Sequence, residues 1–162
     1  MTNKSVMVAY FSHSGNTQVI ANQIHEIAGG DIFKIDPIDQ YPNEYNAVVE
    51  QARKELDQGF LPELKTNVEN PASYNEIYLG YPNWWGTVPR PVASFLSTNE
   101  LSGKTIVPFC THEGSGLGRS VADIRKLCPG STVMEGFAVK GGSVHTAGKD
   151  VAAWLREIGI KG

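Results

Sequence analysis

The fold is indicated near the start of the chain, by the stretch Ser5-Val6-Met7-Val8-Ala9-Tyr10-Phe11-Ser12-His13-Ser14-Gly15-Asn16-Thr17. Residues 5–11 are nearly all apolar, as is typical of a strand that is buried on both faces. A short polar loop follows and leads into residues 16–28, whose apolar side chains recur at helical spacing: Ile20, Ile24, Ile27 and Ala28. A buried strand followed at once by an amphipathic helix predicts the first half of a βαβ unit.

The same alternation continues to the end of the chain. Further apolar runs predict strands at residues 32–35, 77–80, 105–110 and 133–139. The segments that follow them predict amphipathic helices, carrying in turn Tyr45, Val48, Val49, Ala52 and Leu56; Val92, Phe95 and Leu96; Leu117, Val121, Ile124 and Cys128; and Val151, Trp154, Leu155 and Ile158. Strands that alternate with helices imply a parallel sheet with helices on both faces, because parallel neighbours need helical crossovers.

The two weakest strand patterns suggest the order of the strands. Residues 32–35 alternate apolar with polar, and residues 133–139 are interrupted by Glu135 and Gly136, so we expect both at the sheet edges. The prediction is therefore an α/β fold with a doubly wound five-stranded parallel sheet, order 2-1-3-4-5. Ligands of such sheets bind at the carboxyl ends of the strands, beside the switch point between strands one and three.

The composition of the chain excludes some classes of function. The 162 residues include 14 Lys+Arg and 17 Asp+Glu, giving a net charge of −3, and no basic cluster extends beyond Arg53-Lys54. We therefore expect a single domain over residues 1–162 that does not bind nucleic acid. The apolar run at residues 6–11 is far shorter than the roughly 20 residues that span a bilayer, so a cytoplasmic protein without a membrane partner is expected. Cys110 and Cys128 lack metal-site spacing, and two buried, reduced thiols with no bound metal are expected.

The loop after the first strand is suited to an anion. Ser12, Ser14, Gly15, Asn16 and Thr17 offer hydroxyls, an amide and close backbone approach at the positive end of a helix. These residues predict a phosphate site without a cation. The alternative interpretation is an ordinary capped helix start, where the same residue types are favoured.

The loop after the third strand carries two adjacent tryptophans, in the sequence Tyr81-Pro82-Asn83-Trp84-Trp85-Gly86-Thr87-Val88-Pro89-Arg90-Pro91. The prolines and the glycine predict an irregular, exposed loop, and exposed rings favour a planar aromatic ligand. The alternative is that one tryptophan packs onto the helices while the other covers a hydrophobic edge.

The loop after the fourth strand is rich in glycine: Thr111-His112-Glu113-Gly114-Ser115-Gly116-Leu117-Gly118-Arg119. Its spacing departs from the dinucleotide fingerprint, and it follows the fourth strand rather than the first. We expect its small residues to let a flat ligand lie close to the backbone.

Together the three loops resemble those of the flavodoxin family, over essentially the whole chain. Residues 12–17 resemble the family's phosphate loop, and residues 81–86 and 111–116 resemble its two flavin-ring loops. The resemblance implies non-covalently bound FMN. It implies cofactor contacts from residues 12 and 14–17, from Pro82, Asn83, Trp84, Trp85 and Gly86, and from Thr111, His112, Glu113, Gly114 and Ser115. It implies no catalytic residue of the chain's own.

Two functions are open at this point. The first is electron transfer to a redox partner protein; the alternative is an FMN-dependent NAD(P)H:quinone or related oxidoreductase, with a small electron acceptor. The chain would act as a monomer or homodimer. His13, His112, Arg90 and Arg119 are expected to place positive groups near the flavin. A phosphate-accepting receiver is disfavoured because the first and third strands end without a carboxylate.

Overall fold

The structure, a computed structural model, describes residues 5–158. Its sheet is wholly parallel, with the order β2-β1-β3-β4-β5 and a last strand, β6, that also pairs with β4. The strands are β1 (Val6–Tyr10), β2 (Asp31–Lys34), β3 (Glu76–Pro82), β4 (Thr105–His112), β5 (Thr132–Val133) and β6 (Phe137–Lys140). The doubly wound fold and the predicted strand order are confirmed.

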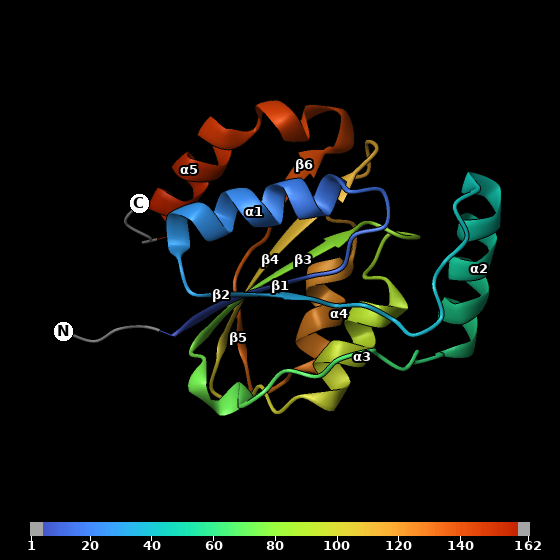
Figure 1. Cartoon of the computed structure of the whole chain (residues 1–162), viewed down its shortest axis with the longest axis horizontal. Helices are drawn as coiled ribbons and strands as arrows, with labels where there is room; N and C mark the ends of the chain where they lie inside the picture. The colour runs from blue at the N-terminus through green and yellow to red at the C-terminus, as the bar shows by residue number, and fades with distance from the viewer. Residues whose placement is uncertain (1–4, 159–162) are drawn as a thin grey trace.

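Helices cover both faces of this sheet (Figure 1). They are α1 (Asn16–Ala28), α2 (Tyr45–Gln58), α3 (Arg90–Thr98), α4 (Ser120–Leu127) and α5 (Gly148–Glu157), with short 3₁₀ helices at Pro71–Ser73 and Gly141–Thr146. One core lies between the sheet and the pair α1 and α5. The second core lies between the sheet and the pair α3 and α4. Helix α2 lies at one end of the molecule, where its Val48 joins the core that α3 covers.

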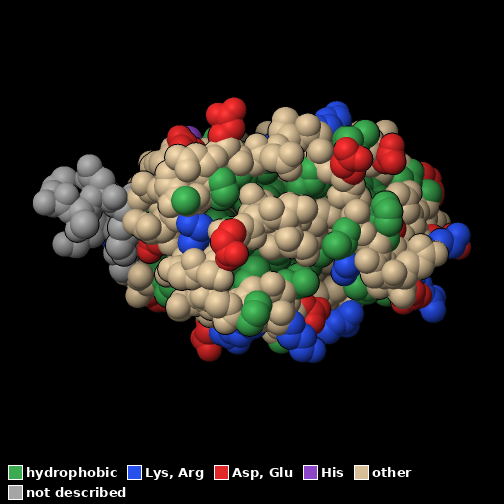
Figure 2. Space-filling model, turned by 90° about the horizontal axis from the view of Figure 1, so that it is seen from below, with side chains coloured by type: hydrophobic (Ala, Val, Ile, Leu, Met, Phe, Trp, Pro, Cys, Tyr) green, Lys and Arg blue, Asp and Glu red, His purple; other side chains and the backbone are tan. Residues whose placement is uncertain are grey.

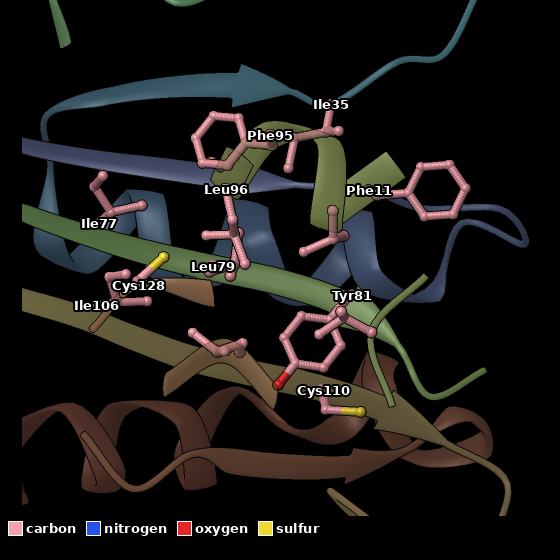
Figure 3. Packing of buried hydrophobic residues seen from close by; sticks show 14 of the residues in the cluster. Phe11, Ile35, Ile77, Leu79, Tyr81, Phe95, Leu96, Ile106, Cys110 and Cys128 are labelled. Carbon is pink, nitrogen blue, oxygen red and sulfur yellow. The ribbon is translucent and has the colours of Figure 1, made fainter. Parts of the chain in front are cut away.

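Burial along the strands follows their place in the sheet. Every residue of β1 is buried, as expected for a central strand covered on both faces. Strand β2 is largely exposed and lies at the edge. Figure 3 shows the core on the side of α3 and α4, where Leu79 and Tyr81 of β3 lie close to Ile106 and Cys110 of β4. Cys110 and Cys128 are both buried and free, as expected.

The predicted fifth strand is present in two pieces. Ile106 pairs with Val133, and Phe109 pairs with Phe137. Between these two pairs the partner segment advances four residues while β4 advances three, so the partner segment has one extra residue. The carbonyl oxygens of Lys104 and Ile106 accept hydrogen bonds from the N–H groups of Thr132 and Met134. Because residues alternate along a strand, Pro108 faces the same neighbouring strand, but it has no N–H to donate. The extra residue forms a bulge at this break in the ladder.

The surface seen from below carries charged side chains of both signs, interspersed with hydrophobic ones (Figure 2). Within residues 5–158, no helix has both the length and the apolar character that crossing a bilayer requires.

Candidate functional site

A pocket of about 450 Å³ lies at the carboxyl ends of β1, β3 and β4. This volume falls in the range of roughly 300–1,000 Å³ that small-molecule sites occupy. The loops after all three strands line it, and so do one face of α2 and Gly141. The pocket therefore lies beside the switch point between β1 and β3, where ligands of this architecture bind.

The loop between β1 and α1 is held by one serine. The hydroxyl oxygen of Ser12 accepts from the N–H groups of Gly15, at 3.1 Å, and Gln18, at 3.3 Å. Gly15 is the residue before the helix, and it has no side chain that could cap the first-turn N–H groups. Its neighbours Ser14 and Asn16 line the pocket. Because first-turn N–H groups have no intrahelical acceptor, this helix start offers donors at the positive end of the helix dipole. The residues fit a phosphate group.

Thr17 has a different place from its neighbours. Its hydroxyl is buried and lies 2.8 Å from the hydroxyl of Thr111, at the end of β4. This bond joins the start of α1 to the loop after β4. Thr17 therefore lies behind the pocket lining, where it holds Thr111, which itself lines the pocket.

The tryptophan loop is a tight turn rather than an irregular one. Trp84 and Thr87 exchange two backbone hydrogen bonds, and Trp85 and Gly86 between them have φ values of 58° and 81°. Two consecutive positive φ values are typical of a type I′ turn. The side chain of Asn83 stabilises the turn, because its oxygen accepts from Gly86 N–H at 2.8 Å and its amide donates to the carbonyl of Gly116 at 2.7 Å.

The two tryptophans have different environments. Trp84 is half-buried and packs edge-on against Phe11 and Tyr41, with ring centroids 5.3 and 4.9 Å apart. Trp85 is 44% exposed, and its indole N–H donates to the carbonyl of Val49 at 2.8 Å. Trp85 is thus the exposed ring that the sequence predicts, whereas Trp84 packs inward, as in the alternative interpretation of this loop. Both line the pocket.

The loop after β4 is bonded to the tryptophan loop. The N–H of Arg119 donates to the carbonyl of Gly86 at 2.7 Å, directly beside Gly118. A Cβ at position 118 would lie 2.4 Å from that carbonyl oxygen, and the φ of Gly118 is 55°, so both space and backbone conformation require glycine. The ring nitrogen Nδ1 of His112 accepts from the N–H of Gly114 at 2.9 Å. This bond engages Nδ1 within the loop and leaves Nε2 as the ring nitrogen available to a ligand.

Asn16 and Glu113 both approach Gly141 at the lining of the pocket. A Cβ at position 141 would lie 2.7 Å from the amide nitrogen of Asn16 and 3.1 Å from a carboxylate oxygen of Glu113. A side chain at position 141 would therefore displace two polar groups that border the pocket. Glycine leaves room for both groups around a ligand.

Eleven of the fifteen predicted cofactor residues line this one pocket. The other four, Ser12, Gly15, Thr17 and Gly114, lie in the loops that shape it. Sequence reasoning does not identify the wall formed by Tyr45, Val48, Val49 and Ala52 of α2, nor Gly141. The apolar spacing of α2 gives a signal, but that signal alone indicates only a helix that covers the sheet.

The expected cluster of positive groups is only partly present. His13 and His112 line the pocket, but Arg90 and Arg119 do not. Arg90 Nε donates to the carbonyl of Phe60 at 2.7 Å, and Arg119 Nε lies 3.4 Å from the carboxylate of Asp123. Each arginine has a partner of its own, but Arg119 stays close to the pocket, because a Cβ at the lining residue Gly86 would lie 3.5 Å from its Nη1. Within residues 5–158, no group of three or more His, Cys, Asp or Glu is arranged to hold a metal ion.

The fold and this pocket define a doubly wound α/β protein with an anion cradle beside an aromatic slot. A family model described as flavodoxin matches residues 5–158. The chain belongs to the flavodoxin family. No curated protein sequence matches it significantly.

Three solved structures share the fold. A protein from Bacteroides eggerthii described as a candidate flavoprotein is 32% identical, with 98% of this chain and 100% of that chain covered and a TM-score of 0.86. A second one, from Bacteroides uniformis, is 26% identical, with 96% and 99% covered and a TM-score of 0.83. A flavoprotein from Lactobacillus acidophilus, solved in complex with FMN, is 21% identical, with 89% and 98% covered and a TM-score of 0.73.

Proposed function

We propose that this protein binds FMN non-covalently in the pocket at the carboxyl ends of β1, β3 and β4, and that it transfers electrons through the bound flavin. Membership in the flavodoxin family supports FMN as the cofactor. The observation that carries the proposal is the convergence of the α1 anion cradle and the two tryptophans on one pocket. FMN carries a phosphate and a flat aromatic ring, and the pocket has a suitable group for each.

Different parts of the pocket would hold different parts of FMN. Ser14, Asn16 and the first-turn N–H groups of α1 would hold the phosphate. Each hydrogen bond to a charged oxygen contributes about 1.5–3 kcal/mol, so several of them can hold a phosphate without a cation. The tryptophans would flank the ring, and Asn83 with the backbone of residues 111–115 would bind its polar edge.

When bound, FMN supplies one-electron and two-electron transfer. The residues of the chain determine what surrounds that chemistry. Trp84 and Trp85 would limit the access of water to the ring, and Nε2 of His112, whose Nδ1 accepts from the N–H of Gly114, would be available to the ligand. Glu113 is the one Asp, Glu, Lys or Arg among the described residues that line the pocket, so the described lining holds no lysine or arginine that would favour an anionic reduced ring.

A second candidate function is that of an FMN-dependent NAD(P)H:quinone or related oxidoreductase. The apolar face of α2 favours it, because Tyr45, Val48, Val49 and Ala52 border the pocket beside the tryptophans. An apolar wall beside the ring would suit a small apolar acceptor. In the first function the partner is a redox protein, and in the second it is NAD(P)H with a small acceptor.

Anaerobic titration of the FMN-loaded protein tests both functions. One sample receives dithionite, another NADH and a third NADPH, and the visible absorbance of the flavin is recorded. Reduction by dithionite in two resolved one-electron steps, with no bleaching by either nucleotide, supports a carrier. Rapid bleaching by NADH or NADPH supports the oxidoreductase. Failure of the protein to retain FMN on gel filtration would refute the proposed function as a whole.

A further inference from the structure

Strand β6 has one edge without a neighbouring strand. Within the described part of the chain it pairs only with β4, where Cys110 lies opposite Ala138. The even-numbered residues of β4 point their main-chain groups toward this neighbour, as the bonds accepted by Lys104 and Ile106 show. In a parallel pair, the residue opposite such a residue points its own groups away. The N–H and carbonyl of Ala138 and the N–H of Lys140 therefore face outward, as on an open sheet edge.

A groove lies along this open edge, between β6 and α5. Its volume is about 520 Å³, and it shares no lining residue with the pocket at the carboxyl ends of β1, β3 and β4. The lining runs along α5 from Ala147, just before the helix, to Glu157, a length of about 15 Å at 1.5 Å per residue. An extended segment of about five residues has the same length. The groove thus has the position and length of one additional short strand.

The groove is apolar inside and acidic along α5. The rings of Phe137 and Trp154 stack with their centroids 4.7 Å apart, and both rings line the groove. Asp150 and Glu157 are exposed and lie one turn before and one turn after Trp154. Lys140 is the one lysine or arginine in the described lining, against these two carboxylates. A lysine or arginine side chain fits this arrangement, because its stem can cover the rings while its cation reaches a carboxylate.

The same charges disfavour a second copy of this chain on the edge. A two-fold axis that pairs two β6 edges leaves both α5 helices on the same face of the joined sheet. Asp150 and Glu157 would then face the same carboxylates of the other copy. The net charge of −3 on each chain adds to this repulsion. A basic partner is attracted instead.

We infer that the open edge of β6 and helix α5 form a docking site for an extended, basic segment of a partner protein, which adds to the sheet as a short strand beside β6. Main-chain hydrogen bonds to Ala138 and Lys140 supply affinity, and basic side chains at alternate positions, directed to Asp150 and Glu157, supply specificity. The break in the ladder before β6 limits the site to a short segment. Because this site is separate from the flavin pocket, the inference does not depend on the proposed function.

The first test is the binding of a short peptide of alternating lysine and valine to the FMN-loaded protein, measured by isothermal titration calorimetry. Two further peptides carry N-methyl groups, one on every lysine and the other on every valine. Main-chain groups alternate in direction along a strand, so only one of these two peptides loses the N–H groups that pair with β6. We expect that peptide to bind about tenfold more weakly and the other to bind like the unmethylated one.

Variants of the protein test the same site from its own side. Asp150→Asn and Glu157→Gln should each weaken binding of the lysine peptide about two- to fivefold, as expected for exposed charge pairs. Glu135→Gln is their matched control, because Glu135 is also exposed but does not line the groove, and it should leave the affinity unchanged. Ala138→Pro removes the outward N–H, which an edge strand tolerates, and it should weaken binding about tenfold.

Three results would overturn the inference. The first is failure of the lysine peptide to bind, or equal binding of all three peptides by all variants. The second is equal or tighter binding of a peptide with glutamate in place of lysine, which would exclude a basic partner. The third is a parent protein that sediments as a dimer while Ala138→Pro sediments as a monomer, which would assign the edge to a second copy of the chain. The methylated peptides test the strand pairing without any change to the protein.

Discussion

At the scale of single residues, Gly118 determines how the two ring loops meet. A Cβ there would collide with backbone atoms of Gly86, the nearest at 2.4 Å, and backbone cannot rotate away as a flexible side chain can. We expect Gly118→Ala to combine a left-handed backbone penalty of about 1–2 kcal/mol with an overpacking penalty of about 1–3 kcal/mol. The bond from Arg119 to Gly86 would break, so FMN affinity should fall as well. Urea unfolding and FMN titration measure the two effects.

Gly116 provides the control, because its φ is 64° and a Cβ at this position would have no heavy atom outside the adjoining residues within 4 Å. Gly116→Ala should show the backbone penalty alone, about 1–2 kcal/mol, with little change in FMN affinity. Equal losses of stability in the two variants would show that the contact between Gly118 and Gly86 is unimportant.

At the scale of elements, the buried hydroxyl pair of Thr17 and Thr111 joins α1 to β4. Thr17→Val leaves the hydroxyl of Thr111 buried without its partner, which should lower the free energy of unfolding by about 1–3 kcal/mol. Replacing both threonines by valine removes both polar groups together, and it should lower stability little more than the single change does. A double-mutant cycle from urea unfolding measures the coupling. Strictly additive losses would contradict it.

The elements also show where sequence reasoning stops. The period of α2 correctly predicts a helix with an apolar face at Val48 and Ala52, but periodicity does not say what that face meets. Here it meets a pocket as well as the core. Residues 133–139 predict one strand whose apolar run is interrupted at Glu135 and Gly136, and the structure breaks the strand at these residues, beside Pro108 of β4, which lacks the N–H that the ladder needs. The interruption is visible in the segment itself, whereas the missing donor of Pro108 lies on the neighbouring strand.

At the scale of the whole molecule, the topology explains why most of the site is predictable. Parallel strands bring their carboxyl ends to one edge, so three loops that are far apart in sequence converge there. Trp84 and Trp85 show the limit of this argument. They are adjacent in sequence, yet the ring of Trp84 packs on Phe11 and the ring of Trp85 lies against α2. The positive φ of Trp85 directs the two side chains to these different places. Loop conformation of this kind depends on tertiary contacts.

Because the fold buries two thiols, it also makes the free energy of unfolding depend on pH in the alkaline range. Burial raises the pKa of Cys110 from an ordinary value of 9.0 to about 12, and that of Cys128 to about 11. In the unfolded chain both thiols lose their protons near pH 9, whereas the folded protein retains them. The unfolded state therefore binds fewer protons above pH 9, and stability present at lower pH is lost as the pH rises, by up to about 1.4 kcal/mol per pH unit for each thiol.

Urea unfolding between pH 7 and 10 should show this fall in stability, and Cys128→Ala should make it shallower, because one of the two protected thiols is then gone. Burial also raises the pKa values of Tyr41, Tyr78 and Tyr81 above their ordinary value of 10.0. These tyrosines therefore contribute to the loss of stability only at the upper end of this pH range. An unchanged slope in Cys128→Ala, or rapid labelling of the native thiols by a disulfide reagent at pH 8, would show that these thiols are not protected by the fold.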